Sequence, residues 1–426
     1  MSQPADIAIV GAGAAGLAAA IFAAQSNPSV RVTVLDGAKT IGAKILVSGG
    51  GRCNVTNHKV TASDFHGNRK VIDRILRRFT ENDTCHWFDS LDVPLQTEPT
   101  GKLFPVSNKA RTVLHALIDQ CQKLSITLLT QHRVRSITYQ EPDFVLQHEQ
   151  GILPVRKVIM ATGGRSLPKS GSDGSGWDLA QHLGHTVTPT YPSLVPLVLD
   201  PSFFHPELSG ISHEVTLTTR VKERIVDRRT GSLLWTHFGI SGPVVMDASR
   251  FWVLAQEQGH HVQLHLNSVP QSTHQDIQNW LIQSSARPGR QTVQSLIAER
   301  LPSRVATQLT HFLHPDLGLT PANLLQKKTR NALIHTLLNL SLPVLESRGW
   351  NFAEVTAGGI PLQEINPSTM ESKKVPGLYL IGEMLDCDGR IGGFNFQWAW
   401  STGYLAGYHA SQPCKEKPIK DQITHD

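Results

Sequence analysis

The sequence predicts an α/β protein whose nucleotide-binding domain is split into two segments around a β-rich insert. Three observations support this fold class. A glycine-rich turn follows the first apolar strand and precedes an alanine-rich helix. Short strand-like runs separated by prolines begin near residue 191, and periodic helical segments follow after residue 270. A glycine-rich pattern of strands and turns returns near residue 347, so we expect both ends of the chain to build one domain.

The length of the chain sets the number of folding units. Its 426 residues exceed the roughly 250–300 at which a single hydrophobic core stops growing. We predict a first segment of the nucleotide-binding domain at 1–190 and its second segment at 347–426. Between them we place a β-rich domain at 191–270 and a small helical subdomain at 271–346.

Composition narrows the class of protein. The chain is 40% hydrophobic and 18% charged, which is typical of globular proteins. No signal peptide and no apolar run of membrane-spanning length is present, so we expect a soluble cytoplasmic protein that does not bind a membrane. Five cysteines without a C-x-x-C pair disfavour disulfides and a metal site. The net charge of +5 permits a polyanionic partner without demonstrating one.

The first elements form a β-α-β unit. We expect strands at 6–10 and 31–35 and a helix at 17–25. In the turn, Gly11 allows a tight bend, Gly13 lets the backbone approach a pyrophosphate, and Gly16 lets the helix pack against the strand. Asp36 ends the second strand, where a carboxylate accepts hydrogen bonds from ribose hydroxyls. These features predict a dinucleotide site.

The remaining elements follow from periodicity. Residues 71–91 and 109–124 are predicted to be helical, and 125–139, 144–147 and 155–160 to be strands. The insert contributes strands such as 215–221 and 262–266, followed by helices at 276–284, 292–300 and 322–340. The strand at 155–160 ends abruptly in an A-T-G-G turn.

Three further glycine-rich segments favour FAD over a nicotinamide dinucleotide as the bound cofactor. They lie at 161–164, 382–386 and 392–397, and contacts at the far end of the chain fit flavoproteins. The glycine-rich loop at 44–54 is interpreted as a further flavin contact. The predicted cofactor-binding residues are Gly11, Gly13, Ala14, Ala15, Gly16, Asp36, Lys44, Ser48, Gly49, Gly50, Gly51, Arg52, Asn54, Ala161, Thr162, Gly163, Gly164, Gly382, Glu383, Asp386, Gly392, Gly393, Phe394, Asn395, Phe396 and Gln397.

Cys53 is the candidate catalytic residue in the 44–54 loop. Beside Arg52 and glycine N–H groups its thiol could have a lowered pKa and act as an acid or nucleophile. The alternative is a buried cysteine that packs against the flavin. A structural role is also the alternative for three other residues. His237 is either a proton donor or a structural histidine, and at least one of Trp398 and Trp400 is expected in the core.

The motifs together resemble the BaiN/RdsA-type flavoproteins, also described as aminoacetone-oxidase-like FAD-binding enzymes. The resemblance rests on G-A-G-A-A-G at 11–16, S-G-G-G-R-C-N at 48–54, W-T-H-F-G-I-S-G-P at 235–243, T-M-E-S-K at 369–373 and G-G-F-N-F-Q-W-A-W at 392–400. It implies one bound FAD, a Rossmann-like FAD domain in two segments, and an inserted β domain with a helical subdomain. Members are linked to reduction of a uridine in 23S ribosomal RNA and to small-molecule redox reactions.

Three functions are considered, and the family resemblance favours the first. The first is NAD(P)H-driven reduction of a uridine in 23S rRNA to dihydrouridine, and the second is oxidation or reduction of a small amine, ketone or enone. The third is a flavin-bound RNA or ribosome-assembly factor. NAD(P)H would bind transiently, because no second dinucleotide motif is present. A basic cluster on the insert is the candidate contact for ribosomal RNA, and it comprises Arg220, Lys222, Arg224, Arg228 and Arg229. We make no prediction of oligomeric state.

Overall fold

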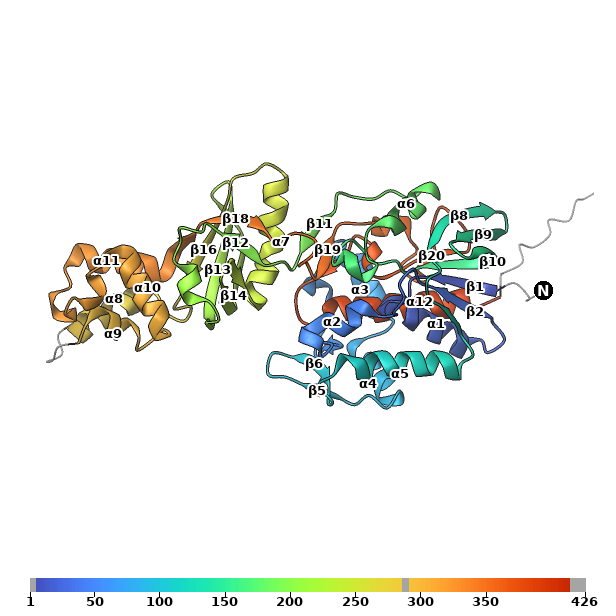
Figure 1. Ribbon diagram of the computed structural model, residues 1–426, viewed down its shortest axis with the longest axis horizontal. Helices are drawn as coiled ribbons and strands as arrows, with labels where there is room; N and C mark the ends of the chain where they lie inside the picture. Colours follow the sequence, from blue (N-terminus) through green and yellow to red (C-terminus); the bar gives the residue numbers. More distant parts are fainter. Residues whose placement is uncertain (1–4, 286–290, 414–426) are drawn as a thin grey trace, which may run out of the picture.

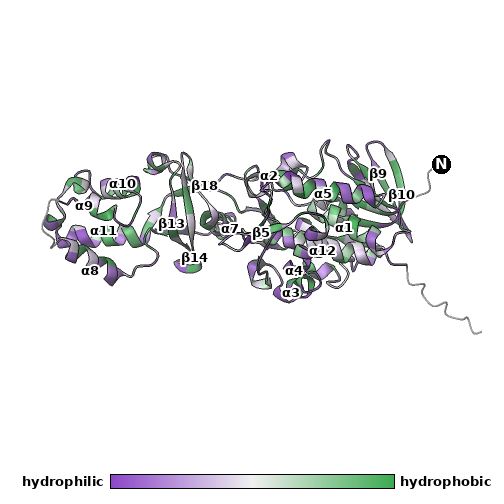
Figure 2. Ribbon diagram, turned by 90° about the horizontal axis from the view of Figure 1, so that it is seen from below, coloured by the Kyte–Doolittle hydropathy of each residue, from purple (hydrophilic) through white to green (hydrophobic). Residues whose placement is uncertain are grey.

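The computed structural model describes residues 5–285 and 291–413, which form two parts along one axis (Figure 1). One part has a hydrophobic core drawn from both ends of the chain, from Ala5 to Ala180 and from Ile360 to Ala410. The other part has its own core, built between Val195 and Ala353. Viewed from below, the helices from α8 (His274–Ser285) to α11 (Lys327–Asn339) again lie at the opposite end from α1 (Ala14–Ser26) and α12 (Phe394–Ala410) (Figure 2).

The first part is organised by a seven-stranded sheet. Its order is β7 (Thr127–Leu129), β2 (Val32–Leu35), β1 (Ala5–Val10), β10 (Gly151–Met160), β9 (Asp143–His148) and β8 (Val134–Gln140). The long strand β10 has two neighbours on one side. Its first half pairs antiparallel with β9, and its second half pairs parallel with β20 (Leu378–Leu380). The C-terminal segment therefore enters the sheet beside the N-terminal β-α-β unit.

Two helices from opposite ends of the chain pack closely against this sheet. Helix α1 spans Ala14–Ser26 and helix α12 spans Phe394–Ala410. A methyl group on Gly403 would lie 2.8 Å from the Ala15 carbonyl oxygen, and one on Gly407 would collide with the Ala19 carbonyl oxygen. Small residues on both helices therefore set a contact that larger side chains could not make.

Smaller elements complete the first part. The helices are α2 (Ala43–Gly51), α3 (Arg69–Leu76), α4 (Glu81–Ser90), α5 (Ala110–Lys123) and α6 (Ser175–His182). A three-stranded sheet has the order β3 (Thr56–Asn57), β6 (Lys102–Pro105) and β5 (Leu95–Thr97), and β4 (Phe65–His66) pairs with β21 (Asp388–Gly389).

The single helix expected at 71–91 is two helices. Thr80 and Asp83 form a capping box that starts α4 anew, with the Thr80 N–H donating to Asp83 at 2.7 Å.

The second part is a seven-stranded antiparallel sheet. Its order is β17 (Leu340–Leu342), β16 (Val262–Asn267), β13 (Ser212–Val221), β14 (Arg224–Thr236), β15 (Gly239–Ser241), β12 (Leu197–Leu199) and β18 (Val344–Ser347). The helix α7 (Pro243–Glu257), which our reading of a mostly β insert missed, begins with a proline at a position where no backbone donor is needed. Residues 340–347, expected to be helical or to belong to the helical subdomain, return to this sheet.

A helical cap forms the far end of the second part (Figure 1). It contains α8 (His274–Ser285), α9 (Val293–Ile297), α10 (Ser303–Leu313) and α11 (Lys327–Asn339). Buried Ile277, Leu296, Leu309 and Leu333 belong to the same core as the β-sheet. The cap is thus continuous with the insert sheet rather than a separate folding unit.

A two-stranded ribbon joins the two parts. Strands β11 (Tyr191–Ser193) and β19 (Val355–Ala357) pair antiparallel where the chain leaves and re-enters the first part. A buried ion pair lies near this ribbon, where Arg250 of α7 donates to both oxygens of Asp388 at 2.6 and 3.0 Å. The Ile391 N–H also donates to Asp247 of α7 at 2.7 Å. These contacts fix the insert on the loop between β20 and α12.

A polar network fastens the end of the first segment to the T-M-E-S-K region. The Glu364 carboxylate contacts His185 Nδ1 at 2.6 Å and accepts hydrogen bonds from Thr186 and Lys374 at 2.6 and 2.7 Å. Burial alone would raise the pKa of Glu364, but these hydrogen bonds outweigh it and lower the pKa to about 2. On the other side, Ser372 Oγ lies 2.9 Å from His185 Nε2.

No helix among the residues that the structure describes is both long and apolar enough to cross a membrane. Over the same residues, no three His, Cys, Asp or Glu side chains come together as a metal site would require.

The contact between α1 and α12 gives the first testable prediction. Replacing Gly407 with Ala should lower the free energy of unfolding by about 3 kcal/mol, because the added methyl group collides with the Ala19 backbone. Denaturant unfolding measures the change. Tyr408→Ala, at an exposed position of the same helix, is the matched control and should cost less. An equal loss in both variants would contradict the close contact.

The Glu364 network gives a prediction about pH. Its carboxylate has a pKa of about 2 in the folded protein against 4.5 when unperturbed, so its stabilisation is complete above pH 4.5 and is lost as pH falls towards 2. Glu364→Gln should therefore lower stability by about 2–3 kcal/mol at neutral pH and by much less near pH 2–3. Denaturant unfolding of both proteins across this range measures it. A pH-independent difference would show that the charge of Glu364 is not the stabilising feature.

Candidate functional site

The structure brings most of the predicted cofactor residues around one cavity of about 420 Å³ in the first part. It lies between the N-termini of α1 and α12, the 44–54 loop and the ends of β10 and β20. The predicted residues that line it are Gly13, Ala14, Ala15, Lys44, Ser48, Gly49, Gly50, Arg52, Asn54, Ala161, Gly163, Gly382, Glu383, Gly392, Gly393, Asn395 and Phe396. Those that do not line it are Gly11, Gly16, Asp36, Gly51, Thr162, Gly164, Asp386, Phe394 and Gln397.

The three glycines of the first turn have different roles. Gly11 has φ +105°, and a methyl group there would collide with the Ala161 carbonyl oxygen. A methyl group on Gly16 would collide with the Gly11 carbonyl oxygen, so both residues shape the turn itself. A methyl group on Gly13 would meet nothing within 4 Å and would occupy open space in the cavity. Gly13 is therefore the glycine that leaves room for a ligand.

Asp36 holds the turn from outside the cavity wall. Its Oδ2 accepts the Ala12 N–H at 2.7 Å and its Oδ1 accepts the Ala38 N–H at 2.8 Å. The carboxylate thus lies against the glycine-rich turn at the end of β2. Each oxygen keeps a second lone pair, so acceptance of a ribose hydroxyl remains chemically open to it.

The 44–54 loop is a broken helix. Ser48 leaves the helical conformation at φ −65°, ψ 148°, and Gly49 and Gly50 are left-handed, so the backbone turns towards the cavity. Arg52 is held by Glu98 at 2.7 Å and lies 3.9 Å from the centre of the Phe104 ring. Its charge is therefore shared with Glu98 as well as presented to the cavity.

Lys44 and Glu383 form an ion pair that joins the two segments of the domain. Lys44 Nζ donates to Glu383 Oε2 at 2.5 Å and to Ser166 Oγ at 2.7 Å. Glu383 Oε1 accepts from Ser166 Oγ at 2.7 Å and from the Thr356 N–H at 3.0 Å. Ser166 was missed in the sequence, although it lies only two residues beyond the predicted A-T-G-G turn.

The N-terminus of α12 faces the cavity, whereas several predicted residues in its first turn support the fold. Gln397 is fully buried, accepts hydrogen bonds from Thr56 and Thr84 at 2.7 and 2.8 Å, and donates to the Phe79 carbonyl. Phe394 is buried against Phe65. These contacts leave the backbone N–H groups at the start of the helix as the part available to an anion.

Cys53 does not have the properties of a reactive thiol. It has no exposed surface, is not among the residues that line the cavity, and adopts a left-handed backbone at φ +61°. Burial raises the pKa of Cys53 to about 12, although a hydrogen bond with Ser48 opposes the shift. The lowered pKa that the sequence suggested for Cys53 is therefore wrong, because desolvation outweighs the hydrogen bond with Ser48. The packing alternative fits the structure.

Both tryptophans of α12 are buried and hydrogen-bonded. Trp398 Nε1 donates to the Gly382 carbonyl at 3.1 Å, and Trp400 Nε1 donates to the Val55 carbonyl at 2.9 Å. Trp398 also lines the cavity, which Trp400 does not. His237 is exposed on the second part and does not line the cavity either.

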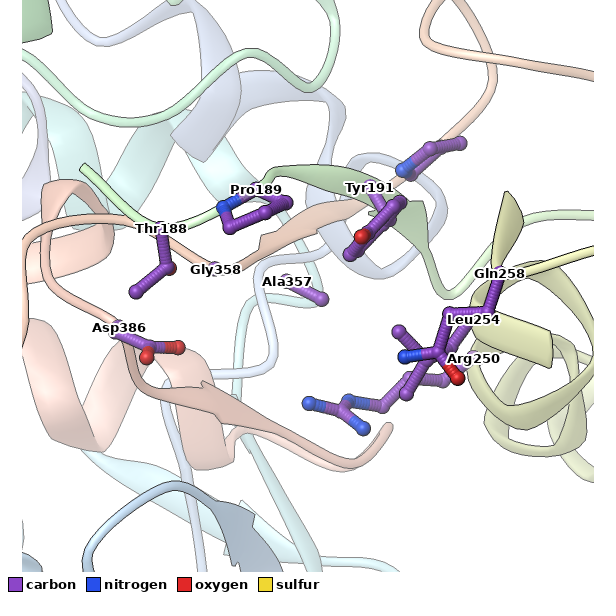
Figure 3. Close-up of a pocket in the computed structure, with 10 residues that line it drawn as sticks. Thr188, Pro189, Tyr191, Arg250, Leu254, Gln258, Ala357, Gly358 and Asp386 are labelled. Atoms are coloured by element: carbon purple, nitrogen blue, oxygen red, sulfur yellow. The ribbon is translucent and has the colours of Figure 1, made fainter.

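A second, smaller cavity of about 270 Å³ lies between the two parts (Figure 3). Thr188, Gly358 and Asp386 of the first part face three residues across it: Arg250 and Leu254 of α7, and Gln258, which directly follows α7. The predicted cofactor residue Asp386 is therefore placed here and not in the larger cavity. Burial raises the pKa of Asp386, while Arg250 and a hydrogen bond from Thr188 oppose the shift.

Comparison with known proteins identifies the family. A profile described as "HI0933-like protein Rossmann domain" matches residues 5–409. The chain belongs to this family. A 3-dehydro-bile acid delta(4,6)-reductase of Clostridium scindens is 32% identical over 95% of this chain and 99% of its own length. A ribosomal RNA dihydrouridine synthase of Escherichia coli is 33% identical over 94% of this chain and 96% of its own length.

Solved structures agree on the fold. E. coli quinol fumarate reductase has a TM-score of 0.50 at 18% identity and covers 96% of this chain and 70% of its own. A 3-ketosteroid delta1-dehydrogenase from Sterolibacterium denitrificans has a TM-score of 0.51 at 12% identity, with 95% and 99% covered. The chain thus has the Rossmann-like α/β fold of these flavoproteins. Its family and its full-length relatives show that it is an FAD-dependent oxidoreductase.

The cavity fits the cofactor. Open space at Gly13, two helix N-termini and left-handed glycines in the 44–54 loop offer backbone N–H groups to phosphate and to the polar edge of a flavin. Further residues that sequence reasoning missed line the same cavity, and they include Lys102, Phe104, Leu194, Glu354, Arg390 and Ile391. No glycine motif marks them, because they come from separate strands and from the junction with the insert.

Gly13 provides the test of FAD binding at this site. Its φ of −82° suits any residue and a methyl group meets no protein atom, so Gly13→Ala should leave stability nearly unchanged while FAD affinity falls at least tenfold. Absorbance of the purified protein and chromatography of the released nucleotide measure occupancy and identity. The matched control, Gly16→Ala, should instead lose stability through the collision with Gly11. Full FAD occupancy in Gly13→Ala would contradict the placement.

Proposed function

We propose that this flavoprotein reduces a uridine of 23S ribosomal RNA to dihydrouridine, with NAD(P)H as the electron donor. The observation that carries the proposal is similarity along nearly the whole chain to two proteins named ribosomal RNA dihydrouridine synthase. The second, from Haemophilus influenzae, is 33% identical over 97% of this chain and all of its own length. Bound FAD supplies hydride chemistry, and the protein supplies binding, orientation and charge.

One side of the cavity offers groups that would hold the cofactor, and the side near the insert offers groups that would meet the substrate. Gly13 and the N-termini of α1 and α12 leave room and N–H donors for the dinucleotide. Lys102 and Arg390 line the same cavity near the insert and add positive charge where a phosphate-bearing substrate would approach. The sequence holds a single G-x-G-x-x-G turn after a strand, which supports transient rather than permanent binding of NAD(P)H.

The β13–β14 hairpin is the proposed contact for RNA, with one correction. We expected Arg229 to contact RNA as part of the basic cluster, but its guanidinium group is already engaged within the protein. It pairs with Asp227 at 2.7 Å and Asp247 at 3.4 Å and lies 5.2 Å from the Phe251 ring centre. Strand alternation turns it towards α7. The other members, Arg220, Lys222, Arg224 and Arg228, remain at least partly exposed, and we keep these four as the RNA-binding surface.

Reduction of a small molecule is the second candidate. It is favoured by the bile acid reductase, whose identity to this chain is nearly the same as that of the RNA enzymes. A flavin-bound RNA-binding factor is the third candidate, and it shares the RNA-binding surface but predicts no turnover. The three differ in whether RNA binds and whether it is reduced.

Incubation of unmodified 23S rRNA with enzyme and NAD(P)H should form dihydrouridine, measured by mass spectrometry of nucleosides. Arg224→Ala with Arg228→Ala should weaken RNA binding and reduce the salt-dependence slope by about one for each phosphate that is no longer bound. FAD content should not change. The control pair, Lys123→Ala with Arg135→Ala, lies on α5 and β8 of the other part and should keep wild-type RNA affinity.

Each alternative has its own signature in this experiment. RNA binding without dihydrouridine in either naked RNA or ribosomal precursors would support the binding factor. Turnover of a small enone without any reaction on RNA would support the second candidate. A double variant on the hairpin with unchanged affinity and slope would remove this surface from the proposal.

A further inference from the structure

We propose that the Glu354 carboxyl group donates the proton that completes reduction of the substrate. This inference rests on the proposed reductase function. It assigns a task that Cys53 cannot perform, because Cys53 is buried away from the cavity.

The backbone of Glu354 is held at the junction of the two parts. Its N–H donates to the Leu194 carbonyl at 3.1 Å, which extends the β11–β19 ribbon, and its carbonyl accepts from Ser166 Oγ at 3.3 Å. Ser166 in turn contacts Lys44 and Glu383. Glu354 is therefore anchored to the polar cluster of the cofactor cavity while its side chain is free to serve another purpose.

The Glu354 side chain lines the cavity and is exposed there, although protein surrounds it on its other sides. Within residues 5–285 and 291–413, its carboxyl has no hydrogen bond or ion pair. A carboxyl group directed into a ligand cavity without a protein partner is poised to interact with what binds there. It lies beside the insert, on the side of the cavity where we place the substrate.

Other cavity groups are less suited to giving up a proton. Both oxygens of Glu383 are occupied by Lys44, Ser166 and the Thr356 N–H. Arg52 and Arg390 are engaged by carboxylates, Arg52 by Glu98 at 2.7 Å and Arg390 by Asp64 at 2.8 Å. Lys102 lines the cavity too, but an ammonium ion is a weaker acid than a carboxylic acid.

The burial of Glu354 and the charges around it determine the pH range in which its carboxyl group can donate a proton. Burial raises the pKa of Glu354; Lys102 of β6 and Lys44 of α2 oppose the rise, and Asp247 of α7 adds to it. Arg390 and Glu383 complete the ionisable groups of the same cavity wall. Because the pKa is raised, the carboxyl keeps its proton to a higher pH than an ordinary Glu, and donation should weaken as pH rises through that value.

The chemistry balances with the donors already named. NAD(P)H is the source of the electron pair and the hydrogen that C6 of the uracil ring gains as hydride, and FAD held in the cavity would supply the chemistry of this transfer. The C5=C6 π bond breaks, and C5 takes the Glu354 proton. The carboxylate then regains a proton from water, so uridine, NAD(P)H and one proton give dihydrouridine and NAD(P)+. A conjugated enone would require the same proton at the carbon next to its carbonyl group.

The test compares Glu354→Gln with Glu354→Asp and with Glu346→Gln, an exposed carboxyl of β18 that serves as the matched control. In the holoenzyme, E354Q should retain FAD and normal reduction by NAD(P)H but lose about 10²–10⁴-fold in single-turnover reduction of uridine in 23S rRNA. E354D should recover part of the rate. We expect the wild-type rate to fall with rising pH and this fall to be absent in E354Q.

A second readout separates this inference from the proposed function. Infrared titration of the holoprotein between about pH 4 and pH 8 should show a carboxyl with a raised pKa in wild type that E354Q lacks. If wild type reduces no RNA, the same variants are tested on a small enone. Wild-type rates in E354Q on the substrate that wild type reduces would overturn the proposal. If wild type reduces neither the RNA nor the enone, the infrared titration is the remaining test. An ordinary pKa for the Glu354 carboxyl then overturns the proposal, and a raised pKa supports it.

Discussion

The close contact between α1 and α12 is the constraint on which the cofactor site depends. Gly403 and Gly407 let α12 pack directly against the Ala-rich face of α1, although the two helices come from opposite ends of the sequence. Both helices then start at the same cavity, where their dipoles and free N–H groups converge. A dinucleotide site built on one helix from each end of the chain forms only when the whole first part has folded.

The split domain also explains why so many site contacts cross between segments. The Lys44–Glu383 ion pair, the hydrogen bonds of Gln397 and the pairing of β20 with β10 all join residues from the two halves. Each is worth only about 1–3 kcal/mol on the usual scale of hydrogen bonds to charged or buried groups. The ion pair lies in the cavity wall, and the other two contacts hold the helix and the strand that end at the cavity, so assembly of the fold also assembles the site.

Sequence reasoning succeeded where one segment determines its own conformation. The Gly11–Gly16 turn, the first β-α-β unit and the Rossmann-like class follow from local spacing. It failed where the outcome depends on packing between distant segments. Burial of Cys53 reversed the expected shift of its pKa, and pairing with Asp247 took Arg229 from the basic cluster. Glu354 belongs to no glycine motif, so only the structure could place it in the cavity.

The ribbon of β11 and β19 gives the insert an unusual attachment. The chain enters and leaves the insert through one pair of neighbouring strands, so the covalent connection between the two parts is narrow. Leu194 and Glu354, which directly adjoin this ribbon, also form part of the cavity wall. The Arg250–Asp388 ion pair and the hydrogen bond from the Ile391 N–H to Asp247 brace this attachment, so the insert keeps one arrangement relative to the cavity wall.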